Sequence, residues 1–197
     1  PVQAKVSESE AERLGKDLPP MGAERAGNAE GTIPEWTGGI TEIPKNVNYK
    51  PEMHWTLPDP FPDDKVLFTI TSQNYTKYAD QLSPGLKGMF KKWPKFKMNV
   101  YKTRRTAAFP QWIYDNTKLN AVQTELVGDD GADGFINGHG GVPFPISTSG
   151  CEIQNNHVNR YRGKAHVVDS QTFTVYADGS KVSGGASRIT YTFPYFR

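Results

Sequence analysis

Residues 167–176, VVDSQTFTVY, and residues 181–196, KVSGGASRITYTFPYF, decide the predicted fold. Both runs are rich in Thr, Val, Tyr and Phe, which are typical of β-strands. Asp178-Gly179 between them is a common hairpin turn. The pattern predicts antiparallel strands that feed a sheet. An exposed edge over residues 181–196 would favour pairing with a C-terminal fragment or a second chain.

Two amphipathic helices are expected on one face of this sheet. Apolar residues repeat at helical spacing over 75–82 and again over 86–93, and Ser83-Pro84 between them reads as an N-cap followed by a proline in the first turn. A short β-type run over 66–70 precedes them. Further helices are expected over 110–120, burying Trp112, Ile113 and Leu119, and over 151–160, with a semi-buried His157.

The N-terminal third has little periodicity. Ser7 and Glu10 form a capping box for a short helix, whereas residues 16–62 are rich in Gly and Pro. We therefore expect an extended arm over 1–62, anchored by Trp36 and Trp55, and a body of helices and first strands over 63–197. The fold class expected is α+β, with a curved antiparallel sheet, a few amphipathic helices and a long N-terminal arm.

Charge and composition narrow the classes of function. With 23 Lys and Arg against 21 Asp and Glu, the net charge of +2 gives no broad reason to bind nucleic acid. The dense basic segment 87–105 reads either as a solvated face or as a contact for anionic lipid head groups. The single cysteine, Cys151, excludes an internal disulfide, and no run of about 18 apolar residues could span a membrane.

Sequence motifs for catalysis and metal binding are sparse. The loop 129–134 lacks several of the oxygen ligands that a calcium loop needs, and the four histidines have no zinc-type spacing. Cys151 and the nearby serines show no nucleophile elbow, and 138–141 lacks the context of a phosphate loop. We expect no catalytic residue, no metal and no cofactor, and predict a protein that is not an enzyme.

Several strings resemble a known bacterial family. They include AERLGKDL (11–18), MGAERAGN (21–28), GTIPEWTGGI (31–40), DDKVLFTI (63–70), YADQLSPG (78–85), VYKTRR (100–105) and GVPFPI (141–146), together with Asn156-His157 and 160–163. The sequence is similar to the domain of unknown function 1329 family, often labelled outer-membrane lipoprotein-sorting proteins. The resemblance implies a fold like that of the LolA/LolB lipoprotein carriers, in which a curved sheet wraps helices and leaves an apolar cavity.

The resemblance also implies a place and partners. It indicates an exported, periplasmic protein linked to outer-membrane transport, of which this chain would be the N-terminal part. The small, polar residues 1–4 are consistent with a removed leader, and the strand pattern at 189–197 with truncation. Envelope transporters are the expected protein partners.

The function expected is a carrier or binding protein for lipids or other hydrophobic compounds. Aromatic residues of the sheet and helices would line its groove: Phe68, Trp93, Phe144, Tyr161, Phe173 and Tyr191. The same residues would also make an ordinary core. The alternatives are a scaffold component of an envelope transport complex and, third, a hydrolase of apolar esters.

Overall fold

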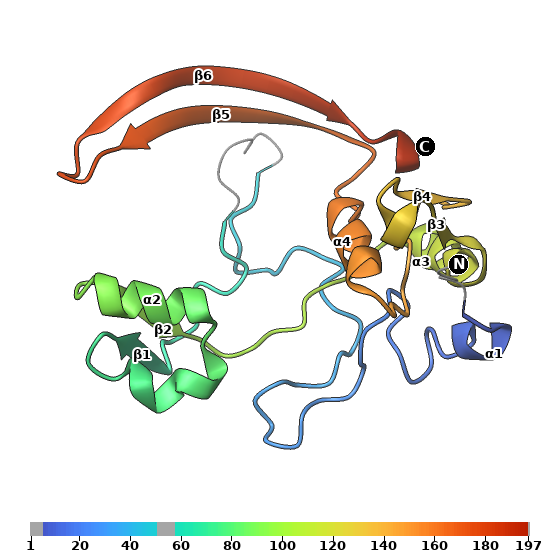
Figure 1. Ribbon diagram of the computed structural model, residues 1–197, viewed down its shortest axis with the longest axis horizontal. Helices are drawn as coiled ribbons and strands as arrows, with labels where there is room; N and C mark the ends of the chain where they lie inside the picture. Colours follow the sequence, from blue (N-terminus) through green and yellow to red (C-terminus); the bar gives the residue numbers. More distant parts are fainter. Residues whose placement is uncertain (1–5, 51–57, 197) are drawn as a thin grey trace.

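A long β-hairpin dominates the shape of the protein in a computed structural model that describes residues 6–50 and 58–196 (Figure 1). Strands β5 (Ala165–Val175) and β6 (Lys181–Thr192) pair antiparallel, as predicted. The turn is closed by the Tyr176 N–H, which donates to the carbonyl of Ser180 at 3.0 Å. Gly179 takes a φ of 87°, a conformation that favours glycine.

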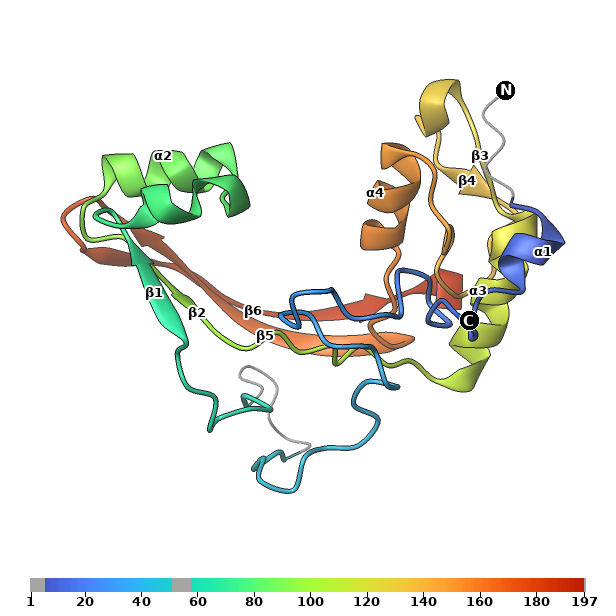
Figure 2. The ribbon, with the colours of Figure 1, turned by 90° about the horizontal axis from the view of Figure 1, so that it is seen from below.

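The hairpin exposes both of its faces. Asp169 pairs with Arg188 on one face, and the hydroxyls of Ser170 and Ser187 lie 2.9 Å apart on the other. A register shift between Thr172 and Phe173 interrupts the ladder. In Figure 2 the hairpin extends from the side of α3 to the side of β1 and β2. A two-stranded ribbon with no covered face is marginally stable alone, so the contacts at its base, such as that between Tyr161 and Phe196, are needed to hold it.

A first helical module packs on a separate small sheet. Strands β1 (Phe68–Thr71) and β2 (Lys97–Val100) pair antiparallel, and a 3-10 helix η1 (Tyr75–Gln81) and helix α2 (Pro84–Lys92) cover them. Ser83 caps α2 by accepting from the Leu86 N–H at 3.3 Å, as predicted. The buried residues at the centre of the module are Ile70, Leu82 and Phe90. The first of the two predicted helices is therefore 3-10 rather than α.

The second module carries the remaining helices. Its elements are α1 (Glu8–Ala11), α3 (Gln111–Gln123), α4 (Gly150–Val158), the two-residue strands β3 (Glu125–Leu126) and β4 (Phe135–Ile136), and the 3-10 turns η2 (Asp129–Gly131) and η3 (Pro194–Phe196). Ser7 and Glu10 form the predicted capping box of α1. Helix α3 packs on α1, where Ala11, Leu14 and Ala121 are buried together.

Helix α3 buries a different stripe from the one expected. Ile113 is fully buried, as predicted, but Trp112 is only half-buried and Leu119 is 44% exposed. The stripe that faces inward is Ile113, Thr117, Asn120 and Ala121. Two of these residues are polar, so the apolar pattern pointed to the wrong face of the helix.

The arm is irregular and is fastened by side-chain contacts to main-chain oxygens. Trp36 is buried and its indole N–H donates to the carbonyl of Ala107 at 2.8 Å, which confirms Trp36 as an anchor. The guanidinium of Arg105 donates to the carbonyls of Arg25 at 3.0 Å and of Ala26 at 3.3 Å, and also contacts those of Glu24 and Pro34. Trp55, the other expected anchor, lies outside the described residues.

The fold class is mixed α+β. Within residues 6–50 and 58–196 there are three separate two-stranded antiparallel sheets and no closed barrel. The proposed division at residue 62 and a single curved sheet remain predictions. None of the described helices is both long and apolar enough to cross a membrane.

The Arg105 contacts generate a test of how the arm is held. Replacing Arg105 by Lys (Arg105→Lys) keeps the charge but removes the planar fork that reaches several carbonyls, so we expect a loss of about 2 kcal/mol. Hydrogen exchange should rise at residues 24–36. Arg104→Lys is the matched control, because Arg104 pairs with Asp64 instead. Equal exchange in both variants would contradict the assignment.

Candidate functional site

A pocket of about 530 Å³ lies where three parts of the chain meet that are distant in sequence: the arm, the region around the start of α3, and residues 141–161. The arm contributes Met21 and Ala23, the start of α3 contributes Phe109 and Ile113, and the loop 141–147 and helix α4 with its C-terminal extension complete the wall. Ligand sites are typically concave and mostly apolar with a few polar groups, in the range of about 300–1,000 Å³. The pocket fits this description.

The walls are mainly aliphatic and aromatic. Ile113 is fully buried beneath the pocket, and Tyr161 closes one side through edge-on contacts with Phe109 and Trp112 at 6.1 and 5.6 Å between ring centroids. Ile153 on α4 lies at the rim with 61% of its surface exposed. An apolar ligand would therefore find apolar contacts in a site that still has an opening to solvent.

Helix α4 holds the loop that forms the floor. The Asn156 amide accepts from the Phe144 N–H at 2.9 Å and donates to the Phe144 carbonyl at 2.8 Å and to the Ser147 hydroxyl at 3.0 Å. Ser147 in turn donates to the same carbonyl at 2.7 Å. Both polar groups at the pocket floor are thus committed to the loop backbone.

Helix α3 holds the other end of the loop through Asn120, which is 1% exposed. Its amide nitrogen donates to the carbonyls of His139 at 2.8 Å and Val142 at 3.0 Å and to the Tyr195 hydroxyl at 3.2 Å. Its amide oxygen accepts from the His139 N–H at 2.7 Å. One buried side chain therefore joins the helix, the loop and the segment after β6.

The loop also depends on glycine at 141. A Cβ there would lie 2.7 Å from the backbone nitrogen of Thr117 and 2.8 Å from its hydroxyl oxygen. The Thr117 hydroxyl occupies this space because it accepts from the Val142 N–H at 2.9 Å. Gly141 therefore serves close packing against α3, whereas a Cβ at Gly138 or Gly140 would meet Phe135, Tyr195 or Phe196 instead.

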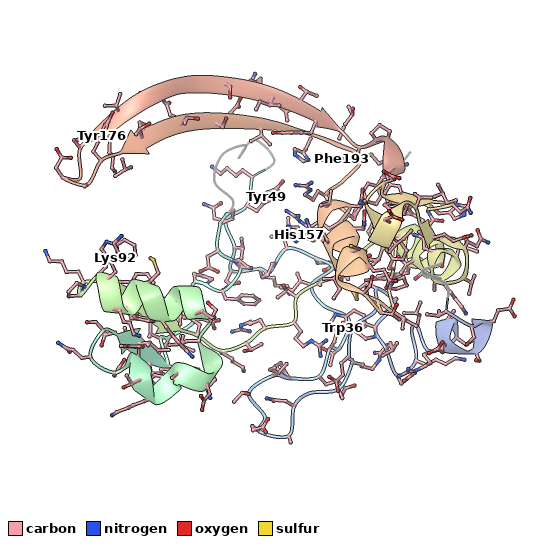
Figure 3. The ribbon with its side chains drawn as sticks, in the orientation of Figure 1. Trp36, Tyr49, Lys92, His157, Tyr176 and Phe193 are labelled. Carbon is pink, nitrogen blue, oxygen red and sulfur yellow. The ribbon has the colours of Figure 1, made fainter. Side chains whose placement is uncertain are left out.

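A chain of aromatic rings connects the pocket with the end of the hairpin. Successive edge-on contacts at 5.0–5.8 Å between ring centroids lead from Phe144 through Phe135, Tyr195 and Phe196 to Tyr161. Phe193 marks the base of the hairpin and Tyr176 its tip in Figure 3. Because Tyr161 precedes β5 and Phe196 follows β6, their contact closes the base of the hairpin.

Burial in this chain raises the pKa of the Tyr195 phenol from 10.0 to about 12. The hydroxyl lies beside the Asn120 amide in a desolvated position, where the neutral phenol is favoured over the anion. Tyr195 therefore stays protonated in the folded protein at pH values where an unfolded chain would lose the proton.

Potential catalytic or metal-binding groups have structural roles or stand apart. Glu152 is fully buried and accepts from the Thr148 hydroxyl at 3.1 Å, and Ser149 caps the helix by accepting from the Glu152 N–H. Cys151 packs against the Leu126–Phe144 cluster. Across residues 6–50 and 58–196, no three His, Cys, Asp or Glu side chains are grouped as a metal would require.

Comparison with known proteins assigns the family. The family model described as "Protein of unknown function (DUF1329)" matches residues 69–196. The chain belongs to this family. A relative from Pseudomonas aeruginosa, named "Uncharacterized protein PA3922", is 44% identical over 163 residues, which cover 82% of this chain and 34% of the relative. The chain thus spans about a third of that relative's length, and no solved structure matches it significantly.

The DUF1329 chain brings only one of the six predicted ligand-binding residues, Tyr161, to the lining of the pocket. Phe144, 3% exposed, belongs to the loop 141–147, but its side chain packs into a core cluster with Leu126. Phe68 stacks on Tyr78 in the other module, and Trp93 lies exposed after α2 with the Lys92 ammonium 4.8 Å from its ring centroid.

The two predicted residues on the hairpin lie apart from the pocket and from each other. Phe173 pairs with Ser183, whereas Tyr191 pairs with His166 on the opposite face. His157, expected to be semi-buried, is exposed on α4, because the buried side of this helix carries Glu152 and the half-buried Asn155 and Asn156. The prediction for His157 was wrong.

The pocket residues that sequence reasoning missed are mostly aliphatic or come from loops. They include Met21, Ala23, Phe109, Val142, Pro145 and Arg160. The family-type strings 21–28, 141–146 and 160–163 contain five of them, which was the available signal. Phe109 lies outside these strings and had no periodic pattern to single it out.

Asn120 can be tested through folding stability. Asn120→Ala leaves the His139 and Val142 backbone groups without their buried partner, so we expect a loss of about 3 kcal/mol in the free energy of unfolding. Chemical denaturation measures this. Asn116→Ala on the same helix removes one bond, to the Gly140 carbonyl, and should cost about 1 kcal/mol. Equal losses would refute a special role for Asn120.

The raised pKa of Tyr195 predicts a pH dependence. Between pH 10 and about 12 the unfolded chain releases the phenolic proton and the folded chain keeps it, so stability is full below this window and falls as pH rises through it. Tyr195→Phe lacks this group. The free energy of unfolding should therefore fall less steeply for the variant across the window. Parallel curves for both proteins would contradict the assignment.

Proposed function

We propose that the chain binds a hydrophobic compound in the pocket between the arm, α3, the loop 141–147 and α4. The observation that carries the proposal is the combination of apolar walls, an accessible rim at Ile153 and a floor held by Asn156 and Asn120. A floor fixed by hydrogen bonds keeps the pocket open, so little ordering is needed when a ligand binds.

The family gives this binding a biological setting. A periplasmic carrier or binding protein for lipids or similar compounds, linked to outer-membrane transport, agrees with the resemblance of the sequence to lipoprotein-sorting proteins. In this proposal the β5–β6 hairpin is the first part of a curved sheet like that of the LolA/LolB carriers. Its exposed faces, and edges that pair with no other strand in the described residues, support that reading, since a two-stranded ribbon gains stability when further strands or helices cover it.

A scaffold role is the second candidate, and the hairpin is the observation that favours it. Large apolar side chains stand exposed along both strands: Val167, Phe173, Val175, Tyr176, Val182 and Ile189. Val167, Phe173 and Val175 share one face of the hairpin, and Val182 and Ile189 lie on the other. Exposed apolar surface of this kind often marks an interaction site. An envelope transporter, a C-terminal fragment or a second chain would be the partner. In this case binding of the partner would not depend on the pocket.

A charge placed at the pocket rim tests the ligand proposal. Ile153→Glu puts a carboxylate beside the opening, and because Ile153 is 61% exposed the fold should tolerate the change. Val158→Glu is the matched control on the same helix, 55% exposed and outside the pocket lining. Native mass spectrometry of the full chain after incubation with an envelope lipid extract would detect bound apolar species.

We expect bound species on the wild type and on Val158→Glu, and at least about a tenfold weaker signal on Ile153→Glu, since an apolar ligand that covers the rim would remove water from the carboxylate, at a cost of more than about 1.4 kcal/mol. Absence of bound species from all three proteins would refute the carrier proposal. If Ile153→Glu retained the bound species, the ligand would have to bind outside this pocket.

A further inference from the structure

We propose that the ligand of this pocket is a single-chain amphiphile with an anionic head, and that Arg160 binds the head group. The inference rests on the proposed function and adds the chemical class of the ligand. It starts from a difference among the polar residues of the pocket: Ser147 and Asn156 are engaged with the loop backbone, and Arg160 is not.

Within residues 6–50 and 58–196, no carboxylate neutralises the charge of Arg160 through an ion pair. Its Nη1 donates to the carbonyl of His157 at 2.9 Å, which uses one of the five N–H groups of a guanidinium. None of the ion pairs in the described part of the chain includes Arg160. Arg160 is exposed, so its remaining donors can meet a ligand at the pocket edge.

The segment that carries Arg160 adds further positive charge. Residues 153–168, IQNNHVNRYRGKAHVV, contain Arg160, Arg162 and Lys164 and no Asp or Glu. The Arg162 guanidinium lies 5.2 Å from the ring centroid of Phe193, and the Lys164 ammonium lies 5.1 Å from that of Trp112. These rings hold the two cations by cation–π contacts without cancelling their charge.

Lys164, the third cation of this segment, is close to the pocket wall. Trp112, below Lys164, contacts Tyr161, whose ring lines the pocket. The nearest acidic residue in the sequence before this segment, Glu152, is buried and hydrogen-bonded to Thr148. The positive charges therefore lie on the Tyr161 side of the pocket. The pocket thus has an apolar interior and a positively charged edge.

An amphiphile with an anionic head matches both the apolar interior and the positive edge of the pocket. A guanidinium binds carboxylate or phosphate through two parallel hydrogen bonds, and these charge-assisted bonds are stronger than neutral ones. The apolar lining at Ile113, Val142 and Pro145 would take the hydrocarbon chain. A pocket of about 530 Å³ is the size of a site for one small ligand, which favours a single chain over a whole two-chain lipid.

Isothermal titration calorimetry on the full chain, below the micelle concentrations of the ligands, tests the inference. Dodecanoate, dodecyl phosphate and dodecanol share one chain length and differ in the head group. Each is titrated into the wild type, Arg160→Gln, Arg160→Lys and Lys95→Gln. The last variant loses one exposed cation from the other module and is the charge-matched control.

We expect the wild type and Lys95→Gln to bind at least one of the two anionic ligands about tenfold more tightly than dodecanol. Arg160→Gln should lose that preference while it keeps its affinity for dodecanol, and Arg160→Lys should retain part of the preference. The stronger of the two anions identifies the head group. Circular dichroism of each variant confirms that it is folded.

A failure of this inference can be distinguished from a failure of the proposed function. Equal affinity of the wild type for dodecanol and for both anions would overturn the anionic head group and leave the apolar site standing. A preference that survives in Arg160→Gln would overturn the role of Arg160. Absence of binding by all three ligands to the wild type would overturn the inference and count against the proposed function.

Discussion

The amide of Asn120 is the interaction on which the second module depends. A buried amide that makes four hydrogen bonds is stable only if every partner is in place, because each unmade bond leaves a desolvated polar group. This requirement fixes the loop after β4 relative to α3. It also ties Tyr195 to the same helix and so brings the chain back to the core after the excursion of β5 and β6.

The pocket follows from that constraint together with a second amide. Asn156 on α4 holds Phe144 in the way that Asn120 holds His139 and Val142, so both ends of the loop 139–147 are fastened to helices. The apolar residues between these two points form a floor with a fixed shape. Since the aromatic chain leads from Phe144 to Tyr161, the same packing supports the floor, the pocket wall and the base of the hairpin.

Local signals in the sequence predicted much of the secondary structure. The Asp178-Gly179 turn, the Ser83 cap and the Ser7–Glu10 capping box all formed because each depends on a few adjacent residues. The buried face of α3 was not predictable from apolar periodicity, since Thr117 and Asn120 are polar and are buried for their hydrogen bonds. The pocket was missed because its wall combines three segments that lie far apart in the sequence: the arm, the region around the start of α3, and residues 141–161.

The faces on which Phe173 and Tyr191 lie could have been predicted from the sequence, but the prediction of a shared groove overlooked them. Counted outward from Asp178-Gly179 with a simple two-residue turn, Phe173 and Tyr191 already fall on opposite faces, and the observed register keeps them there. They could not have lined one groove. Tyr161 lies in the family-type string 160–163 and lines the pocket, whereas Phe68 lies in the string 63–70 and belongs to the other module. Membership of a family-type string therefore did not by itself locate the site.

A crystal structure of the chain with bromine-labelled dodecanoate tests the central claim most directly. We predict that the anomalous signal of bromine lies among Ile113, Val142 and Pro145, with the carboxylate against the guanidinium of Arg160. Bromine along the hairpin, or beside the exposed Ile43 and Tyr49 of the arm, would contradict the account, because the ligand would then bind outside the pocket that Asn120 and Asn156 hold open.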